Sequence, residues 1–337
     1  MAYNLKFSKR TKVTDKGDAW GRGRIEQPIY AVAGANDTGT WEDSPNNSYK
    51  VNDELEDLQK YLKSKGIIRT RGVISSNYDP KKGIPFAIME TFSKNKSKIG
   101  FIEENKGVEF LGKKQADHII DQLMKFHSIS TESLPPSLRK ILKANSGNYT
   151  SFRRQIFSNL NKTVSPLDGK VGEKFYKVIE RHTGISGIKN KTSHLLTKLQ
   201  PIIDTQENNV LSIAHGDMSP NNLYIFDSGY IEFLDLEWVG SFKNSALAMI
   251  NDFGNLRERS WKNKKFRHDL DLALIKHYRL KKHENLGKTI VKLSILRSVI
   301  SLSGAFENYE HLKQEDSIQV KRRTETEKDI LEIFNKD

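Results

Sequence analysis

Short apolar runs separated by polar residues are densest between residues 211 and 234. The runs 211–214, 223–226 and 231–234 consist mainly of apolar residues. Their lengths predict three short strands, with a turn at Asp227–Gly229 between the second and the third. The polar stretch 215–222 is then a tight loop between the first two strands. We expect the last two strands to form a hairpin that brings the loop's polar side chains close to the residues after the third strand.

Strands are also predicted in the first part of the chain. Partial alternation and short apolar runs predict them at Leu5–Val13, Ile29–Ala33, Gly66–Ser75 and Pro85–Phe92. Between them, Asp53–Ser64 places leucines and a tyrosine at helical spacing, which predicts one helix. The segment Asn36–Ser48 is rich in turn-forming residues and is predicted to be a loop.

The rest of the chain shows mainly helical spacing. Helices are predicted before the polar loop at Gln115–His127, Ser137–Ala144, Thr150–Leu160, Gly172–His182 and Ser193–Ile203, and after it at Asn244–Trp261, Arg267–Tyr278, Gly287–Tyr309 and Thr324–Asn335. The chain therefore begins with strands and continues mainly as helices.

Composition excludes several classes of chemistry. The 337 residues include no cysteine, which excludes disulfides, thiolate catalysis and Cys-ligated zinc. The segment Ile295–Phe306 is the longest apolar-leaning one, but it is interrupted by Arg297 and is too short to span a bilayer. The N-terminus, Met1–Lys6, lacks the apolar core of a signal peptide. We expect a cytoplasmic protein with no membrane partner.

The charge balance is strongly basic. The formal net charge is +13, which favours phosphorylated or acidic partners. The lysines are scattered, as at 262–265 and 281–282, and this is typical of a solvated surface. Because no recognisable nucleic-acid-binding module accompanies the charge, the sequence does not favour a nucleic-acid partner.

The polar loop and the third strand supply the candidate chemistry. Asp217 and Asn222 lie in the loop, and Asp235 follows the strand 231–234. Two carboxylates and an amide oxygen are hard ligands that suit Mg²⁺ carrying a nucleotide polyphosphate. The plain structural alternative is a polar hairpin turn in which these residue types occur by chance.

The same residues resemble a known family. The spacing His215-x-Asp217-x-x-x-x-Asn222 is that of the protein-kinase catalytic loop, which carries Arg where this chain has Gly216. His-Gly-Asp followed by Asp235-Leu236-Glu237 resembles the aminoglycoside phosphotransferase and choline kinase group of small-molecule kinases. The resemblance implies an α+β, two-lobed, protein-kinase-like fold, with a β-rich N-lobe at 1–92 and a mainly helical C-lobe at 93–337.

The resemblance also implies roles for these side chains. Asp217 would orient or deprotonate the acceptor hydroxyl, while Asn222 and Asp235 would hold Mg²⁺. Glu237 would assist a second metal ion or bind a cationic acceptor. His215 would brace the loop through hydrogen bonds.

One tripeptide matches a kinase metal-binding motif in sequence but not in its predicted location. Asp252-Phe253-Gly254 has the letters of the metal-binding tripeptide of protein kinases, but it lies within a predicted helix with no strand leading into it. In the family that the chain resembles, a later Asp braces the catalytic loop, and Asp252 matches that residue. His127, at the end of its helix, is likewise expected to be structural.

Nucleotide contacts are expected in the first part of the chain. The resemblance implies a Glu on the helix Asp53–Ser64 that pairs with a Lys; Glu54 is the first choice and Glu56 the second. Lys50 is the candidate Lys, although it lies close to Glu54 in the sequence, and a solvated strand end is the other interpretation. Gly21, in a glycine-rich stretch, belongs either to a phosphate loop or to a plain loop.

The strand Pro85–Phe92 resembles the strand that runs into the kinase hinge. Adenine would then contact backbone groups of Met89, Glu90 and Thr91. The expected cofactors are therefore ATP and Mg²⁺.

Three functions stay open on the sequence alone. The first is an ATP-dependent phosphotransferase acting on a hydroxyl of a small molecule, such as an amino alcohol, an aminoglycoside or a sugar. The helices predicted within 128–210 and the absence of an Ala-Pro-Glu segment after Asp235 favour it. The alternatives are a nucleotide-binding pseudokinase and a protein kinase. A cationic acceptor would suit the acidic and aromatic residues Glu237, Trp238, Glu258 and Trp261.

Overall fold

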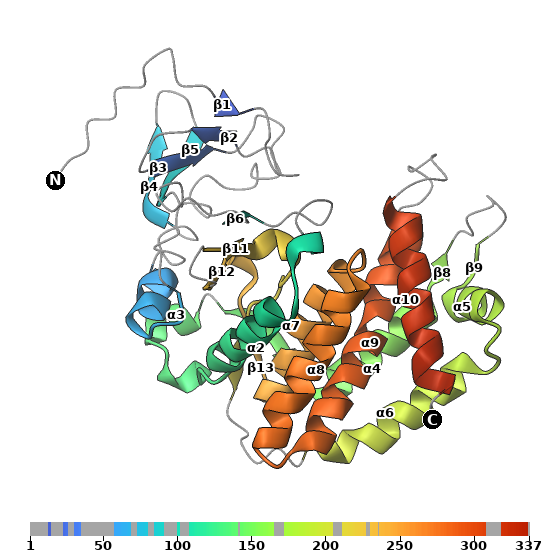
Figure 1. Cartoon of the computed structure of the whole chain (residues 1–337). Coiled ribbons are helices and arrows are strands. Elements are labelled where there is room, and N and C mark those ends of the chain that lie inside the picture. The colour runs from blue at the N-terminus through green and yellow to red at the C-terminus, as the bar shows by residue number, and fades with distance from the viewer. Residues whose placement is uncertain are drawn as a thin grey trace. The chain divides into compact units, whose positions relative to one another are not determined.

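The structure is a computed structural model of the whole chain (Figure 1). It describes residues 13–14, 23–25, 30–34, 57–68, 73–79, 84–90, 100–101, 108–140, 142–164, 172–204, 211–226, 230–234, 236–307 and 318–335. The chain divides into two compact units. Unit 1 comprises Met1–Lys98, Pro135–Ile141 and Phe226–Ser228, and unit 2 comprises Ile99–Leu134, Leu142–Ile225 and Gly229–Asp337.

Unit 1 contains an antiparallel sheet and a helical segment. The strands are β1 (Val13–Thr14), β2 (Gly23–Ile25), β3 (Tyr30–Gly34), β4 (Val73–Asp79) and β5 (Ile84–Glu90), in the spatial order β1-β2-β3-β5-β4. Residues 57–64 are helical and bury Leu58 and Leu62. The strand predicted at Ile29–Ala33 is confirmed as β3. The start of the helix predicted at Asp53–Ser64 lies outside the described residues.

The strand predicted at Gly66–Ser75 lies further along the chain. Gly66 has φ +68° and ends the helical segment, with the Ile67 N–H donating to the Leu62 carbonyl over 3.0 Å. The strand itself is β4, which pairs with β5 as far as Asp79 opposite Ile84. Cross-strand pairing therefore extends beyond Ser75, where the predicted strand ends.

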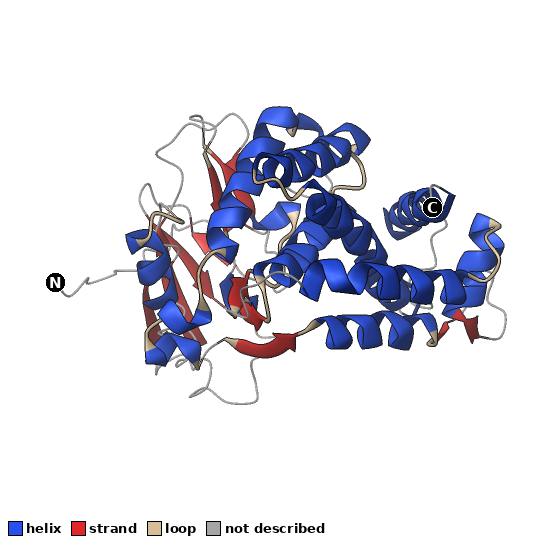
Figure 2. Cartoon of the chain, turned by 90° about the horizontal axis from the view of Figure 1, so that it is seen from below, coloured by secondary structure: helices blue, strands red, loops and turns tan. Residues whose placement is uncertain are grey.

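Unit 2 is mainly helical, as the blue ribbons of Figure 2 show. Its helices are α2 (Lys113–His127), α4 (Tyr149–Leu160), α5 (Phe175–Thr183), α6 (Ile188–Asp204), α7 (Ser245–Arg259), α8 (Lys264–Leu280), α9 (Glu284–Glu307) and α10 (Ile318–Asn335). Short three-ten helices are η1 (Val108–Phe110), η2 (Thr131–Ser133), η3 (Pro220–Asn222) and η4 (Leu236–Trp238). The predicted long helices are confirmed, with ends that shift by a few residues.

Helix α7 lies at the centre of unit 2. It packs against α9, α2 and β10, while α8 packs against α9 and α2 (Figure 1). The Asn244 side chain caps its N-terminus by accepting a hydrogen bond from the Leu247 N–H over 2.9 Å. Almost the whole helix is buried, including the polar Asp252 and Asn255. Because buried polar groups need partners, these two side chains point to a polar site inside the unit.

Three small sheets complete unit 2. They contain β10 (Ser212–Ala214), β13 (Gly240–Phe242) and β7 (Lys143–Gly147); β12 (Ile231–Phe233), β11 (Leu223–Ile225) and β6 (Gly100–Phe101); and β8 (Thr163–Val164) with β9 (Glu173–Lys174). Strands β11 and β12 pair antiparallel, with Leu223 opposite Phe233 and Ile225 opposite Ile231. The predicted hairpin is confirmed, although its turn at Asp227–Gly229 lies outside the described residues.

The helix predicted at Ser137–Ala144 is wrong for its second half. Helix α3 spans only Pro136–Arg139, and β7 begins at Lys143. Strand β7 pairs parallel with β13, which follows it by about a hundred residues in the sequence. A partner so distant leaves no trace in the local pattern, so local propensity is overridden by tertiary pairing.

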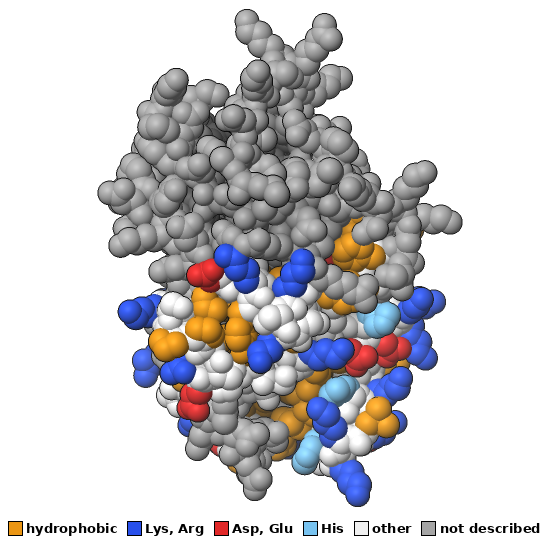
Figure 3. All heavy atoms as spheres, turned by 90° about the vertical axis from the view of Figure 1, so that its left-hand side faces the viewer, with side chains coloured by type: hydrophobic (Ala, Val, Ile, Leu, Met, Phe, Trp, Pro, Cys, Tyr) orange, Lys and Arg blue, Asp and Glu red, His pale blue; other side chains and the backbone are white. Residues whose placement is uncertain are grey.

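The surface agrees with the scattered charge of the sequence. On the described part of the face in Figure 3, Lys and Arg side chains are spread among neutral ones and do not form one continuous patch. Within the described ranges, no helix is both long enough and apolar enough to cross a membrane.

Candidate active site

The candidate active site is the loop between β10 and β11. Residues 215–219 lead from β10 into η3, and η3 continues directly into β11. Both flanking strands are buried, including Ile213 and Leu223. The loop is therefore short and is held at both ends by packed elements.

Asp252 on α7 holds the backbone of this loop. Its Oδ2 accepts a hydrogen bond from the His215 N–H over 2.7 Å, and its Oδ1 accepts one from the Gly216 N–H over 3.0 Å. The Nε2 atom of His127 lies 2.8 Å from Oδ2, and the Asn251 amide donates to Oδ1 over 3.0 Å. The predicted bracing role of Asp252 and the structural role of His127, the last residue of α2, are both confirmed.

Electrostatics favour the ionised form of Asp252. Complete burial opposes the charge, but the hydrogen bond and charge of His127, the charge of His215 and the Gly216 N–H together hold the pKa of Asp252 below its usual value. The brace is therefore a buried, charge-assisted set of hydrogen bonds.

The ring of His215 links the loop to the end of β12. Its Nε2 donates to the Leu234 carbonyl over 2.7 Å, and the fully buried ring packs beside Phe126 and Phe233. His215 therefore holds the backbone at Leu234, the residue that precedes Asp235 in the sequence. The predicted bracing role of His215 is confirmed.

Gly216 is required by the geometry of the loop. Its φ is +87°, and a Cβ atom at this position would lie 1.9 Å from the Trp238 carbonyl oxygen. Only glycine allows both the positive φ and this close approach. The Gly that replaces the Arg of protein kinases therefore has a steric cause in this chain.

Asp217 lies half-buried after Gly216. Its Oδ1 accepts a hydrogen bond from the Asn255 amide over 3.1 Å, and Asn255 is itself buried on α7. The other carboxylate oxygen, Oδ2, accepts no hydrogen bond from the part of the chain that the structure describes. One oxygen of Asp217 is thus held in place and the other is available to a ligand.

The structure brings Asn222 next to Asp217. The Asn222 amide donates to the Asp217 carbonyl over 2.7 Å, and the Asn222 carbonyl accepts from the Leu234 N–H over 2.9 Å. The side-chain Oδ1 of Asn222 accepts no hydrogen bond from the described residues. This side chain, only 8% exposed, therefore keeps an oxygen for a hard cation such as Mg²⁺.

The other predicted site residues are described only in part. Gly21, Lys50, Glu54, Thr91 and Asp235 lie outside the described residues. Met89 and Glu90 lie in β5, and Glu237 lies in η4; their backbone alone is described. Among the described side chains, no group of three or more His, Asp or Glu could hold a metal ion.

A second polar layer lies behind Asp252. Arg297 on α9 donates from Nε to the Asn251 Oδ1 over 3.1 Å. Burial lowers the pKa of the Arg297 guanidinium, while the negative charges of Glu258, Asp252 and Asp217 oppose that shift. Helix α9 therefore supports the brace through Asn251.

Two residues considered for a cationic acceptor are buried. Glu258 is buried, and its Oε1 accepts a hydrogen bond from the Arg322 Nε over 2.7 Å. Trp261 is also buried, whereas Trp238 is 42% exposed. Of the acidic and aromatic residues predicted for the acceptor, the described side chains thus leave only Trp238 at the surface.

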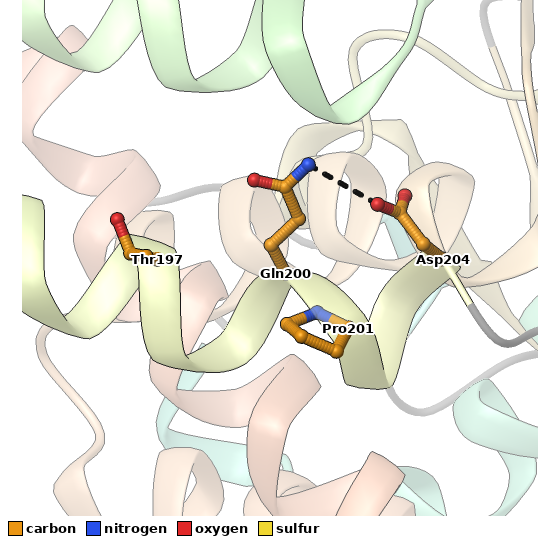
Figure 4. Close-up of a pocket in the computed structure, with 4 residues that line it drawn as sticks. All are labelled: Thr197, Gln200, Pro201 and Asp204. Carbon is orange, nitrogen blue, oxygen red and sulfur yellow. Dashed lines mark hydrogen bonds between the residues drawn. The ribbon is translucent and has the colours of Figure 1, made fainter.

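A hollow on α6 is separate from this loop in the sequence. It has a volume of about 530 Å³ and is lined by Thr197, Gln200, Pro201 and Asp204, all from one helix (Figure 4). The Gln200 amide donates to Asp204 over 3.1 Å within it. This open hollow offers one carboxylate, already hydrogen-bonded, and no convergent set of reactive groups.

Asn255 and Leu234 are the site residues that sequence reasoning missed. Asn255 follows Asp252 by three positions and so lies on the same side of α7, which is the pattern that could have indicated it. Leu234 contributes only its backbone carbonyl, which every residue type has, so its side chain could not indicate this role.

The sequence itself matches no model of a known protein family and no curated protein. Solved structures do match over nearly the whole chain. A Ralstonia eutropha protein assigned as an aminoglycoside phosphotransferase is 18% identical, with 98% of this chain and 94% of that chain covered and a TM-score of 0.53. The GDP complex of a mutant aminoglycoside 2′-phosphotransferase IIIa is 12% identical, with 97% and 92% covered and a TM-score of 0.51.

A third solved structure is a choline/ethanolamine kinase family protein from Mesorhizobium loti. It is 10% identical, with 97% of this chain and 89% of that chain covered and a TM-score of 0.50. The chain thus has the protein-kinase-like fold of the aminoglycoside phosphotransferases and choline/ethanolamine kinases, the group that it resembles from His215 to Asn222.

Proposed function

We propose that this protein is an ATP-dependent phosphotransferase that moves the γ-phosphoryl group to a hydroxyl of a small molecule, such as an amino alcohol, an aminoglycoside or a sugar. One observation carries the proposal. Asp217 lies in a loop whose backbone is fixed by Asp252, and one of its carboxylate oxygens accepts no hydrogen bond from the described residues. A carboxylate in this state is suited to align a hydroxyl and accept its proton.

The proposed reaction assigns a step to Asp217. Its free Oδ2 takes the proton of the acceptor hydroxyl as the hydroxyl oxygen attacks the γ-phosphorus. The bond between that phosphorus and the β,γ-bridging oxygen breaks, and ADP leaves with the electron pair. Little covalent chemistry is left for the protein, so its contribution is positioning and charge neutralisation.

The metal would be held by Asn222 and Asp235, while Glu237 would assist a second metal ion or bind a cationic acceptor. The Oδ1 of Asn222 supports this assignment, because it accepts no hydrogen bond from the described residues and such an amide oxygen suits a hard cation. When bound, Mg²⁺ would neutralise the charge of the nucleotide phosphates. His215 holds the backbone beside Asp235 through the Leu234 carbonyl.

Nucleotide contacts are proposed for the first part of the chain. Glu54 would pair with Lys50 near the phosphates, Gly21 would lie in the phosphate loop, and backbone groups of Met89–Thr91 would contact adenine. We further propose that residues 1–92 and 93–337 are the two lobes of the kinase. The reaction would take place in the cytoplasm, where ATP is available.

The proposal is tested by phosphoryl transfer from γ-labelled ATP to a panel of amino alcohols, aminoglycosides and sugars. Transfer is expected with Mg²⁺ and not with excess EDTA. Asp217→Asn keeps the size of the side chain but loses the charge that accepts the proton. We expect it to lower kcat by about 10²- to 10⁴-fold while nucleotide affinity changes little.

The same assay separates the alternatives. Nucleotide binding without transfer to any acceptor or to water would indicate a pseudokinase. Transfer to the protein itself or to a generic basic protein, and to no small molecule, would indicate a protein kinase. Because one similar structure holds GDP, labelled GTP is included as a second donor. Unchanged turnover of Asp217→Asn would remove Asp217 from the mechanism.

A further inference from the structure

We infer that Asn255 is a positioning residue that fixes the carboxylate of Asp217, so that Oδ2 alone faces the acceptor hydroxyl. The inference rests on the proposed function, because it assigns a role relative to the proposed base. It goes beyond that function by naming a residue outside the loop motif. The hydrogen bond from the Asn255 amide to Asp217 Oδ1 is its starting point.

Helix α7 holds the loop at consecutive residues. Asp252 accepts the N–H groups of His215 and Gly216, and Asn255 donates to the next residue, Asp217. Positions three apart lie on one side of a helix, so a single face of α7 fixes both the backbone and the carboxylate. The loop and its reactive group thus share one rigid support.

The support has little freedom of its own. Helix α7 is capped by Asn244 at its start and is buried along almost its whole length. Asn251 is held between Asp252 and Arg297 of the neighbouring helix α9. A side chain built on such an element is placed more accurately than one on a loop.

The chemistry of the contact follows from the amide group. A carboxylate has two oxygens, and an amide N–H bonded to one of them restricts rotation about the Cβ–Cγ bond. Asn255 is only 5% exposed, so its donation is not replaced by bulk water.

A purely structural asparagine offers a matched control. Asn159 on α4 is 6% exposed, and its amide donates to the Gln155 carbonyl over 2.8 Å. Its other side-chain contact is to Ser303, away from the loop. Asn159→Leu therefore removes a buried helical amide of similar exposure without touching Asp217.

The kinetic test compares Asn255→Leu and Asn255→Asp with Asn159→Leu at a temperature where all are folded. We expect Asn255→Leu to lower kcat by about 10-fold or more, because small displacements of a reacting group are costly. The KM for nucleotide should change less than about twofold, because the variant removes none of the proposed contacts with the nucleotide. Asn159→Leu should leave both constants unchanged.

Asn255→Asp supplies a readout that packing alone does not move. An aspartate of nearly the same size keeps the packing but loses the N–H that donates to Asp217. We therefore expect its kcat to fall as in Asn255→Leu, while the KM for nucleotide is kept. Full kcat in Asn255→Asp, or equal kcat losses in Asn255→Leu and Asn159→Leu, would overturn the inference.

Carbon-13 NMR of the aspartate carboxyls tests the contact without turnover. The resonance of Asp217 is the one missing from the Asp217→Asn spectrum. Its chemical shift at pH 7 should change in Asn255→Leu and stay in place in Asn159→Leu; an identical chemical shift in all three proteins would overturn the inference. If the wild-type protein phosphorylates no acceptor, the proposed function fails, and this measurement alone still decides whether Asn255 controls Asp217.

Discussion

Gly216 determines the shape of the catalytic loop through its missing side chain. Gly216→Ala should be far more damaging than a glycine replacement elsewhere, because the new Cβ would lie 1.9 Å from the Trp238 carbonyl oxygen. Either the loop or η4 must then move away, and Asp217 moves with the loop. Loss of phosphoryl transfer and a lower free energy of unfolding in urea are the expected results.

Gly184 provides the control for this prediction. It also has a positive φ, +72°, but a Cβ there meets no atom within 4 Å. Gly184→Ala should therefore show the cost of the left-handed backbone alone, about 1–2 kcal/mol, with activity retained. Equal losses of stability in the two variants would mean that the contact with Trp238 relaxes freely.

Asp252 should control how stability depends on pH. Its pKa is depressed from an ordinary value near 3.8, so its contribution is present above that value and is lost as the pH falls through the lower pKa of the folded state. Asp252→Asn should lower the free energy of unfolding at pH 7 by about 3 kcal/mol, because it removes a buried charged partner.

Urea unfolding at decreasing pH measures this contribution. The difference in unfolding free energy between wild type and Asp252→Asn should shrink below about pH 4, where the carboxyl of the unfolded state begins to be protonated while that of the folded state is still ionised. A difference that stays constant from pH 7 to pH 3 would contradict the ionised brace.

The roles of single residues were predictable where a sequence motif contains them. They were not predictable where they depend on contacts between residues far apart in the sequence. The roles of His215, Asp252 and His127 follow from the resemblance, and the structure confirms them. The contact of Asn255 with Asp217 joins residues far apart in the sequence, so the loop motif does not contain it. The steric need for Gly216 likewise depends on Trp238, a partner in another element.

Among the elements, α10 is attached to α7 and α8 by buried ion pairs. Arg257 donates to Asp271 over 2.8 Å and to Asp329 of α10 over 2.8 Å, and Arg267 of α8 also binds Asp329. Burial opposes the charge of Arg257, but Asp271 and Asp329 raise its pKa above the usual value. The C-terminal helix therefore depends on charges that are shielded from water.

Asp329→Asn should consequently destabilise the protein strongly. It leaves two buried guanidinium groups without one of their carboxylates, and breaking such a network costs about 3 kcal/mol or more. Glu284→Gln breaks the exposed pair with Arg279 and is the control, with little expected change. Urea unfolding of both variants provides the measurement, and similar stabilities would contradict the importance of the α10 network.

Element prediction succeeded where the pattern is local. The long helices α2, α7, α8 and α9 repeat apolar residues at helical spacing, and their existence follows from the sequence alone. Strand β7 could not be found in this way, because its pairing with β13 is what makes it a strand. The position of β4 was shifted for a similar reason, since β5 extends the pairing to Asp79.

For the molecule as a whole, the short motif from His215 to Asn222 predicted a fold that overall sequence identity does not reveal. The solved structures with this fold are only 10–18% identical to the chain, so most positions differ while the fold is kept. Packing tolerates such change when the apolar pattern survives. A loop that must place backbone N–H groups on Asp252 tolerates less, and so the motif remains readable.

The net charge of the whole chain leads to the last prediction. With a formal charge of +13, the protein should attract an anionic nucleotide over distances beyond direct contact. Salt screens this attraction, since the Debye length falls from about 14 Å near 50 mM to about 4 Å near 500 mM. We therefore expect the Kd for Mg·ATP to rise by roughly tenfold over this range, mainly through slower association.

Adenosine is the control for this salt dependence, because it shares the base and the ribose but carries no charge. Isothermal titration calorimetry should find its Kd nearly constant over the same range of salt, while stopped-flow measurements follow the association rate of Mg·ATP. A parallel rise for both ligands would mean that salt acts on the protein's conformation. A constant Kd for Mg·ATP would mean that the scattered lysines create no effective field at the nucleotide site, and that the basic composition serves only to solvate the surface.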